Sequence, residues 1–196
     1  MKRKYVAQKL IQKLNEKVNS QLNLQDTLIL GVVLKGLPVA YCLARINGLI
    51  ENFVPIVAQR SLPMQHHVES YFLSSEWQTH LHKQLKHCET TLIVDDIVNT
   101  GFTKQRVETT ISSLINRKNT LRFAALILNC KILANPNFIS SNDIFALKIN
   151  AKEVECDWGL AKIPLWDLSI EETLKRCEGY FQKLWLNEKR FITVTY

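Results

Sequence analysis

Buried strands alternate with helical segments along most of this chain, and this alternation constrains the fold more than any other feature of the sequence. The run 27–33 is almost wholly apolar, as expected of a strand that is covered on both faces. A helix is predicted to begin at Pro38, because proline favours the first helical turn, and to end near Asn47 and Gly48. Strands that alternate with helices form parallel sheets with helices on both faces, so the sequence predicts an α/β fold.

The spacing and content of apolar residues predict the other elements. Apolar residues three or four positions apart indicate helices at 4–19, around Trp77, Leu81 and Leu85, at 103–117 and at 169–186. Strands are predicted at 53–58, 91–94, 121–128 and 144–149, and residues 191–196 are expected to add an edge strand. The long segment after the second strand shows no period, and such loops are usually functional or disordered. Together these elements fit a single domain over residues 1–196.

Several features of composition bear on the compartment. No apolar run approaches the roughly 20 residues of a membrane-spanning helix. The basic start lacks the apolar stretch of a secretory signal, and Glu16 with few Ser and Arg residues favours a surface helix over a mitochondrial transit segment. The five cysteines are dispersed without a C-x-x-C pair, which suits a reducing compartment. We therefore expect a cytoplasmic protein with no membrane partner.

The formal net charge of +7 is compatible with nucleic acid and equally with a polyanionic small substrate. Apart from the cluster Lys2-Arg3-Lys4, the basic residues are spread along the chain. The sequence therefore favours a small anionic substrate over nucleic acid.

The stretch 91–104 carries the most chemical information. An apolar strand ends in two adjacent carboxylates, Asp95 and Asp96, which are costly to desolvate unless a metal ion or sugar hydroxyls pair with them. The turn 99–103 opens directly into a helix, and free N–H groups at a helix start favour a phosphate, with Gly101 permitting unusual backbone geometry. An acid pair beside a phosphate cradle suits a ribose 5-phosphate. The alternative is that the acids merely end a strand and that Thr103 caps a helix.

Residues 91–103 resemble the binding signature of the type I phosphoribosyltransferases, which is an apolar strand, two acids, two apolar residues, a variable residue and Thr-Gly-x-Thr. The resemblance implies that the chain binds 5-phosphoribosyl-1-pyrophosphate with Mg²⁺. Asp95 and Asp96 would hold the ribose diol and, mostly through water, the metal ion. The 5-phosphate would lie against Thr100, Gly101, Phe102 and Thr103. A base nitrogen would then displace pyrophosphate from C1 of the ribose.

Weaker resemblance extends over residues 30–167. The segment Leu34-Lys35-Gly36 looks like the family's pyrophosphate-binding turn, in which Lys35 would face the leaving group, although an ordinary strand-to-helix turn is the alternative. Ser70 and Tyr71 are similar to the mobile loop of the purine-salvage members, closest in position to the xanthine-guanine and hypoxanthine-guanine branch. The resemblance implies a core at 25–150, a small hood segment at 151–168 and then the C-terminal helix.

Three positions depart from the pattern of the purine-salvage members. Asn99 stands where they have an aspartate that serves the proton of the base, and an amide cannot accept a proton at neutral pH. Their purine-recognising lysine aligns with Asn129, and Lys131 would substitute for it if the strand continues, because the two would share a strand face. Their stacking aromatic falls near Val154, with Trp158 as a replacement.

We therefore predict a Mg²⁺-dependent phosphoribosyltransferase that acts on a nucleobase, expected to be a purine. Its catalytic residues would be Asp95, Asp96, Asn99 and Lys35. Because Asn99 and Asn129 depart from the pattern, a non-catalytic sensor of phosphoribosyl pyrophosphate is the alternative, and an RNA-binding regulator is a third.

Two weaker expectations complete the interpretation. By family analogy alone we expect a homodimer, with Phe181 and Trp185 as interface candidates that could equally cover the sheet. A zinc site is disfavoured, because His80 and His82 would point to different faces of a helix. The residues considered for it are His66, His67, His80, His82, His87 and Cys88.

Overall fold

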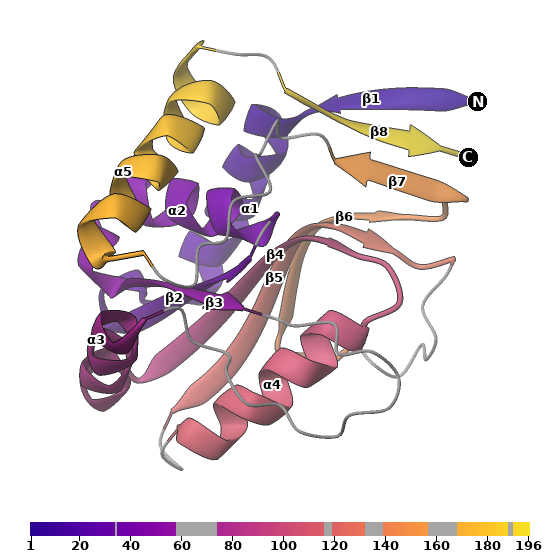
Figure 1. The fold of residues 1–196 in the computed structure, drawn as a ribbon. Coiled ribbons are helices and arrows are strands. Elements are labelled where there is room, and N and C mark those ends of the chain that lie inside the picture. The colour runs from indigo at the N-terminus through magenta and orange to yellow at the C-terminus, as the bar shows by residue number, and fades with distance from the viewer. Residues whose placement is uncertain (34, 58–73, 116–118, 132–138, 157–167, 188–189) are drawn as a thin grey trace, which may run out of the picture.

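The chain folds into a five-stranded parallel sheet with helices on both faces and a smaller antiparallel sheet beside it (Figure 1). The computed structural model describes residues 1–33, 35–57, 74–115, 119–131, 139–156, 168–187 and 190–196. The large sheet has the order β3-β2-β4-β5-β6. Its strands are β2 (Thr27–Val33), β3 (Phe53–Val57), β4 (Thr90–Val98), β5 (Thr120–Asn129) and β6 (Asp143–Ile149). The predicted α/β fold is confirmed.

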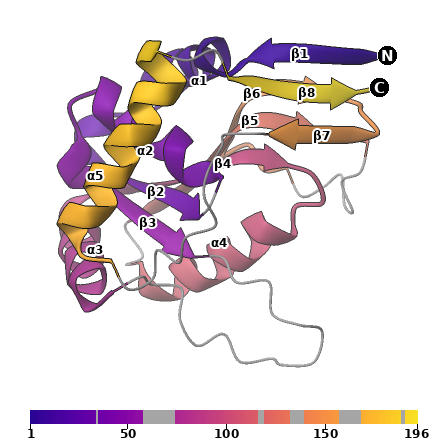
Figure 2. The same ribbon diagram turned by 45° about the horizontal axis from the view of Figure 1, so that its top comes forward.

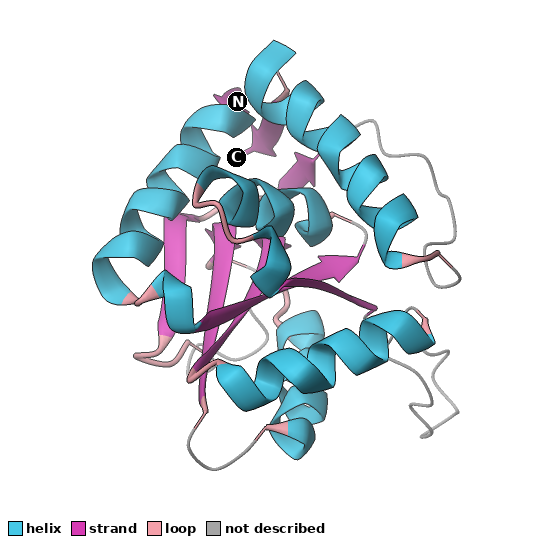
Figure 3. Cartoon of the chain, turned by 90° about the vertical axis from the view of Figure 1, so that its left-hand side faces the viewer, coloured by secondary structure: helices cyan, strands magenta, loops and turns pink. Residues whose placement is uncertain are grey.

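The helices cover the large sheet unequally (Figures 1 and 3). One side carries α1 (Ala7–Gln21), α2 (Gly36–Ile46) and α5 (Ile170–Phe181), the other carries α4 (Phe102–Leu114), and α3 (Ser75–His87) lies beside β3. The described residues also include three short helical segments: η1 (Leu24–Asp26), η2 (Ile50–Asn52) and the π-helical η4 (Gln182–Asn187).

The apolar spacing read from the sequence corresponds to the buried faces. In α3, Trp77, Leu81 and Leu85 are buried, as their four-residue spacing predicts. The Trp77 ring packs edge-on against Phe53 of β3, with centroids 6.2 Å apart, and its Nε1–H donates to the Thr173 hydroxyl of α5 at 3.2 Å. Helix α3 is therefore tied both to the sheet edge and to the C-terminal helix.

The two ends of the described chain lie side by side in the small sheet (Figure 2). Its strands are β1 (Lys2–Val6), β8 (Phe191–Thr195) and β7 (Glu153–Cys156), in the order β1-β8-β7 and all antiparallel. The hydroxyls of Tyr5 and Tyr196 are 2.8 Å apart, so they share a hydrogen bond. Among its described residues, the hood segment contributes the strand β7 to this sheet.

Two predictions about the ends were wrong. Residues 191–196 were expected at an edge, but β8 is the middle strand of the small sheet. The helix expected over 4–19 begins only at Ala7, because residues 2–6 pair with β8. Both errors have one cause: the partners lie about 190 positions apart in the chain, and local periodicity does not report pairing at such a distance.

Other boundaries shift by a few residues. Helix α2 begins at Gly36 rather than Pro38, and α4 ends at Leu114 rather than 117. Strand β4 continues to Val98 instead of ending at Val94, so the two acids are part of the strand and not its end. This last shift matters for function, since neighbouring strands fix the direction of both carboxyl groups.

The residues considered for a dimer interface pack within the chain. The rings of Phe181 and Trp185 stack with centroids 6.4 Å apart, and the Arg45 guanidinium lies over the Phe181 ring.

None of the helices in the described ranges combines the length and the apolar character needed to span a membrane.

We predict that Ile192→Ala lowers the free energy of unfolding by about 2–5 kcal/mol, because this fully buried side chain in the middle strand would leave a cavity. Urea unfolding followed by far-UV circular dichroism measures the loss. Thr193→Ala on the opposite face of β8 is the control, expected to have a much smaller effect. Equal losses in the two variants would contradict the burial of the small sheet.

Candidate functional site

The candidate site lies at the carboxyl ends of β2 and β4, where the order of strands reverses. Strand β2 pairs with β3 on one side and with β4 on the other, and ligands of open α/β sheets bind at such a switch point. The β2–β4 pairing ends at Gly31 and Val94. Asp95 and Asp96 therefore follow directly after the last residue of β4 that pairs with β2, while Asp95 still pairs with Ala125 of β5.

The first turn of α2 closes this crevice from the side of β2. A Cβ atom on Gly36 would lie 2.6 Å from the Val94 carbonyl oxygen and 2.7 Å from the Asp95 Cα. Real Cβ atoms do not come this close to backbone, so only glycine fits here. The predicted pyrophosphate turn and the acid pair are thus in direct contact, with exposed Lys35 as the residue that precedes the helix.

The two carboxyl groups are buried next to one another. Asp95 is 8% exposed and Asp96 is 5% exposed, and the Asp96 backbone N–H donates to Asp95 Oδ1 at 2.9 Å. Burial raises the pKa of both carboxyls, and the Asp96 charge raises that of Asp95 further, while the Lys35 ammonium opposes both effects. Asp96 Oδ2 is buried with no hydrogen-bond partner in the described part of the chain. A ligand that donates hydrogen bonds or carries a cation would stabilise this pair.

The turn after β4 forms a small cavity at the start of α4. Gly101 has φ of 86°, a left-handed conformation that favours glycine, and it precedes Phe102 at the first position of the helix. The N-cap residue is Gly101, so the helix start has no side-chain cap from this position. The cavity has a volume of about 70 Å³ and is lined by Asp95, Ile97, Val98, Asn99, Thr100, Gly101, Thr103 and Lys104. Uncapped N–H groups beside polar side chains suit an anionic group such as a phosphate.

Phe102 points out of this turn and is 59% exposed. Its predicted role is therefore limited to the backbone N–H, because the ring does not line the cavity. Lys104 is a lining residue to which the sequence analysis gave no role. Its buried ammonium lies 2.7 Å from Glu108 and 3.5 Å from Asp143, so it fixes α4 against β6 and makes the cavity less negative. In the sequence, the only indication of this role was that Lys104 directly follows the Thr-Gly-x-Thr turn.

Asn129 is fully buried at the end of β5 and does not face a ligand. Its side chain exchanges two hydrogen bonds with the backbone of Ala151, at 3.1 and 3.2 Å, and donates to Asn99 Oδ1 at 3.4 Å. The strand does not continue to Lys131, which lies exposed in the following turn. The predicted substitution by Lys131 required the strand to continue past Asn129, so the structure does not support it.

The remaining predicted residues fall in several places. Val154 lies half-buried in β7 and pairs with Val194 of β8. Two residues further on, Cys156 is a neighbour of the site that the sequence analysis missed. Its thiol faces Asp96 and lowers the pKa of that carboxyl, whereas the larger effect of burial raises it. Outside the described residues lie Leu34, Ser70, Tyr71, Trp158, His66 and His67.

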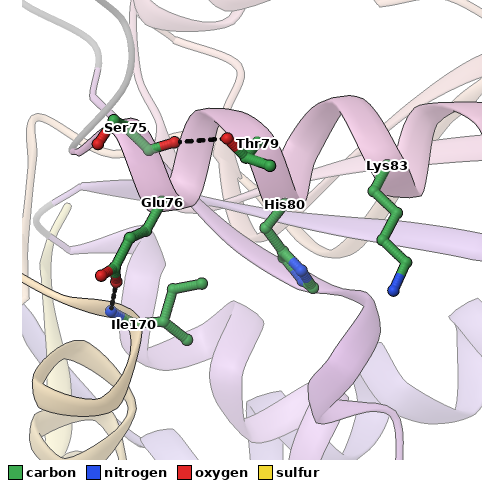
Figure 4. A pocket seen from close by; sticks show the side chains of 6 residues that line it. All are labelled: Ser75, Glu76, Thr79, His80, Lys83 and Ile170. Atoms are coloured by element: carbon green, nitrogen blue, oxygen red, sulfur yellow. Dashed lines mark hydrogen bonds between the residues drawn. The ribbon is translucent and has the colours of Figure 1, made fainter.

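A larger pocket of about 430 Å³ lies elsewhere, between α3 and the start of α5 (Figure 4). Two of its polar groups are engaged within the chain: Thr79 donates to the Ser75 carbonyl oxygen, and Glu76 accepts from the Ile170 backbone N–H at 3.0 Å. None of the predicted site residues lines it. Size alone would favour this pocket, but the smaller cavity is lined by the buried acid Asp95, whose neighbour Asp96 has an oxygen without a partner among the described residues.

The described residues contain no cluster of three or more His, Cys, Asp or Glu that would hold a metal ion by itself. His80 bonds to the Glu51 carbonyl and His82 to the Gln78 carbonyl, so these two rings do not converge. The acid pair, in contrast, fits a cation that keeps most of its water, because Asp96 Oδ2 is an unpaired acceptor.

Solved phosphoribosyltransferases have a similar structure. The HGPRT-ase from Leishmania tarentolae in complex with GMP matches with a TM-score of 0.54 and 12% identity over 100% of this chain and 98% of that chain. The xanthine-guanine-hypoxanthine phosphoribosyltransferase of Helicobacter pylori has a TM-score of 0.51 and 17% identity, over 74% of this chain and 82% of that chain. The purine phosphoribosyltransferase of Pyrococcus horikoshii has a TM-score of 0.51 and 20% identity, over 71% of this chain and 80% of that chain. No family model and no curated protein matches the sequence. The chain therefore has the type I phosphoribosyltransferase fold, as the resemblance implied.

We predict that Asp95→Asn stabilises the ligand-free protein at neutral pH by about 0.5–2 kcal/mol, because an amide stays neutral where burial makes ionisation of the carboxyl unfavourable. Because folding raises the pKa of Asp95, the folded protein loses stability as the pH rises from the unfolded pKa of this carboxyl to its folded pKa. The gain should therefore disappear as pH falls to about 4. Thermal unfolding between pH 4 and pH 8 measures it, with exposed Glu153→Gln as the control. A gain that does not depend on pH would contradict the assigned cause.

Gly36→Ala is expected to destabilise the fold by about 1–3 kcal/mol, because the added methyl meets the backbone of β4 rather than a movable side chain. The matched control is Gly179→Ala in α5, where a Cβ meets nothing within 4 Å and the change should be neutral or stabilising. Urea unfolding of both variants gives the comparison. A Gly36→Ala protein as stable as Gly179→Ala would show that α2 and β4 are not in such close contact.

Proposed function

We propose that this chain is a Mg²⁺-dependent phosphoribosyltransferase, which transfers the 5-phosphoribosyl group from phosphoribosyl pyrophosphate to a nucleobase. The observation that carries the proposal is the buried Asp95–Asp96 pair, set beside an uncapped helix start at a strand-order switch point. The phosphoribosyltransferase fold supports the same reading. A purine is the expected acceptor, because the similar structures include purine and hypoxanthine-guanine enzymes.

Different residues of the chain bind different parts of the substrate. The backbone N–H groups of the 100–103 turn, with the Thr100 and Thr103 hydroxyls, hold the 5-phosphate in the small cavity. The Asp95 and Asp96 carboxylates accept hydrogen bonds from the ribose hydroxyls and from the water shell of Mg²⁺. When bound, Mg²⁺ neutralises charge on the pyrophosphate as it leaves.

Lys35 and the backbone of the following turn face the pyrophosphate. The Lys35 ammonium lowers the pKa of both carboxyls, and this supports a role for Lys35 next to the acid pair. The C1–O bond to pyrophosphate breaks with its electron pair going to the leaving group, and a base nitrogen donates the pair that forms the new C1–N bond. The chain's contribution is orientation and the stabilisation of charge.

A second function is favoured by one observation. Asn99 cannot take a proton from the base, and it is hydrogen-bonded to a buried neighbour. A sensor that binds phosphoribosyl pyrophosphate without transfer would tolerate this. Pyrophosphate release with Mg²⁺ across a panel of bases separates the two functions, since a sensor binds the sugar but releases nothing with any base. We also propose that the protein is a cytoplasmic homodimer, and its elution volume in gel filtration should then correspond to the mass of two chains.

We predict that Asp96→Ala weakens Mg²⁺-dependent binding of phosphoribosyl pyrophosphate at least about tenfold, because hydrogen bonds to a charged group contribute about 1.5–3 kcal/mol each. Asp95→Asn should weaken it similarly while keeping a stable fold. Isothermal titration calorimetry measures both, with Glu153→Gln as the control that changes charge outside the site. Wild-type protein that gives neither heat nor a rise in melting temperature with this ligand would refute the proposed function.

A further inference from the structure

The small sheet has a buried inner face and an open outer face. Ile192 and Val194 of its middle strand are fully buried, and neighbouring residues of a strand point to opposite faces. Thr193 and Thr195 therefore lie on the outer face. The two flanking strands add charged side chains to this face, and all four are exposed: Lys2, Lys4, Glu153 and Glu155.

The register of the three strands arranges these residues in two equivalent rows. In each row a threonine of β8 lies between a lysine of β1 and a glutamate of β7. The lysine and the glutamate of one row are two strand spacings apart, about 10 Å, which is too far for an ion pair. Within the described part of the chain, none of the four charged side chains forms one. The rows are Lys2, Thr195, Glu153 and Lys4, Thr193, Glu155.

An exposed aromatic side chain lies next to these rows. Phe191 of β8 pairs with Val6 of β1 in the following row of the same face, and it is 36% exposed. The Lys4 ammonium lies 5.7 Å from the centroid of its ring. Protein interfaces commonly combine an aromatic side chain with a polar rim. The outer face therefore has the composition of an interface, with a positive edge and a negative edge.

The order of charges makes this face complementary to a copy of itself. Sheets that pack face to face lie about 10 Å apart with their strands nearly aligned, and a lysine and a glutamate can bridge that gap from opposite sides. If a two-fold axis runs parallel to β8, β1 of each copy lies over β7 of the other, and every lysine meets a glutamate of its own row. If the axis runs across the strands, β1 lies over β1 and lysines meet lysines. The charges therefore favour the first arrangement.

We propose that the outer face of the small sheet binds a second copy of this chain, about a two-fold axis parallel to β8. This gives the proposed homodimer an interface other than Phe181 and Trp185, which pack within the chain. A two-fold interface uses the same surface on both chains, so each row contributes two ion pairs. The partner is a second copy rather than a nucleic acid, because a phosphate backbone on this face would meet the glutamates as well as the lysines.

The test reverses the charge at each end of one row and then at both ends. Lys4→Glu and Glu155→Lys each place like charges opposite one another at two symmetric positions, so each should weaken dimerisation at least about tenfold. The double variant restores the complementary order with the signs exchanged, and it should dimerise within about threefold of the wild type. Sedimentation equilibrium over a range of protein concentrations measures the dissociation constants.

The control is Lys83→Glu, which makes the same change of charge at an exposed position of α3, away from the small sheet (Figures 1 and 2). It should dimerise like the wild type. Because salt screens ion pairs between exposed side chains, the wild-type dimer should weaken as the salt concentration rises. Far-UV circular dichroism checks that each variant is folded. A variant that does not fold is replaced by Lys4→Gln or Glu155→Gln, for which the loss should be about two- to fivefold.

A mixture of the two single variants gives a sharper result. Lys4→Glu carries glutamate at both ends of the Thr193 row, and Glu155→Lys carries lysine at both ends. Each variant repels itself in this row and complements the other, so the mixture should form heterodimers more tightly than either variant forms homodimers.

Two results would overturn the proposal. A wild-type protein that stays monomeric at every concentration would exclude the interface together with the homodimer. A dimer whose dissociation constant is unchanged by both single reversals would exclude the interface and leave the homodimer in place. Neither measurement depends on phosphoribosyl transfer, so a failure of the proposed enzymatic function is recognised separately, by calorimetry with phosphoribosyl pyrophosphate and Mg²⁺.

Discussion

Two carboxyl groups buried in contact with each other in the last half of β4 set the conditions for the rest of the structure. Burial opposes their ionisation, and one oxygen of Asp96 has no partner within the described chain. The protein tolerates this because β5 holds Asp95 in register with Ala125 and because the Lys35 ammonium partly compensates the charge. A site built in this way is less stable empty than filled, which is common where binding is the function.

The close contact between α2 and β4 follows from the same requirement. Gly36 brings the helix start against the backbone of Asp95, so the two loops that follow β2 and β4 form the walls of one crevice. In a fold of this type, sugar and pyrophosphate would occupy adjoining parts of that crevice, each held largely by backbone. At position 99 this chain differs from the purine-salvage pattern.

The large sheet and the acid pair could be predicted from the sequence because their signals are local. The apolar run 27–33 and the spacing of Trp77, Leu81 and Leu85 each reflect burial of one short segment. The small sheet could not be predicted, since β8 pairs with strands that are distant in the chain. The orientation of Asn99 was equally hidden, because it depends on Asn129 and Ala151, which only the folded sheet brings close.

The position of β8 between β1 and β7 has a consequence for the order of folding. Closing the β1–β8 pair brings together segments separated by about 190 residues, which carries a larger loss of chain entropy than any pairing in the parallel sheet. Contacts of such long range generally form late. Cys156 ends β7 and faces Asp96, so the surroundings of the acid pair would reach their final state only after the two ends of the chain have met. Binding competence in this molecule would then be acquired in the last stage of folding.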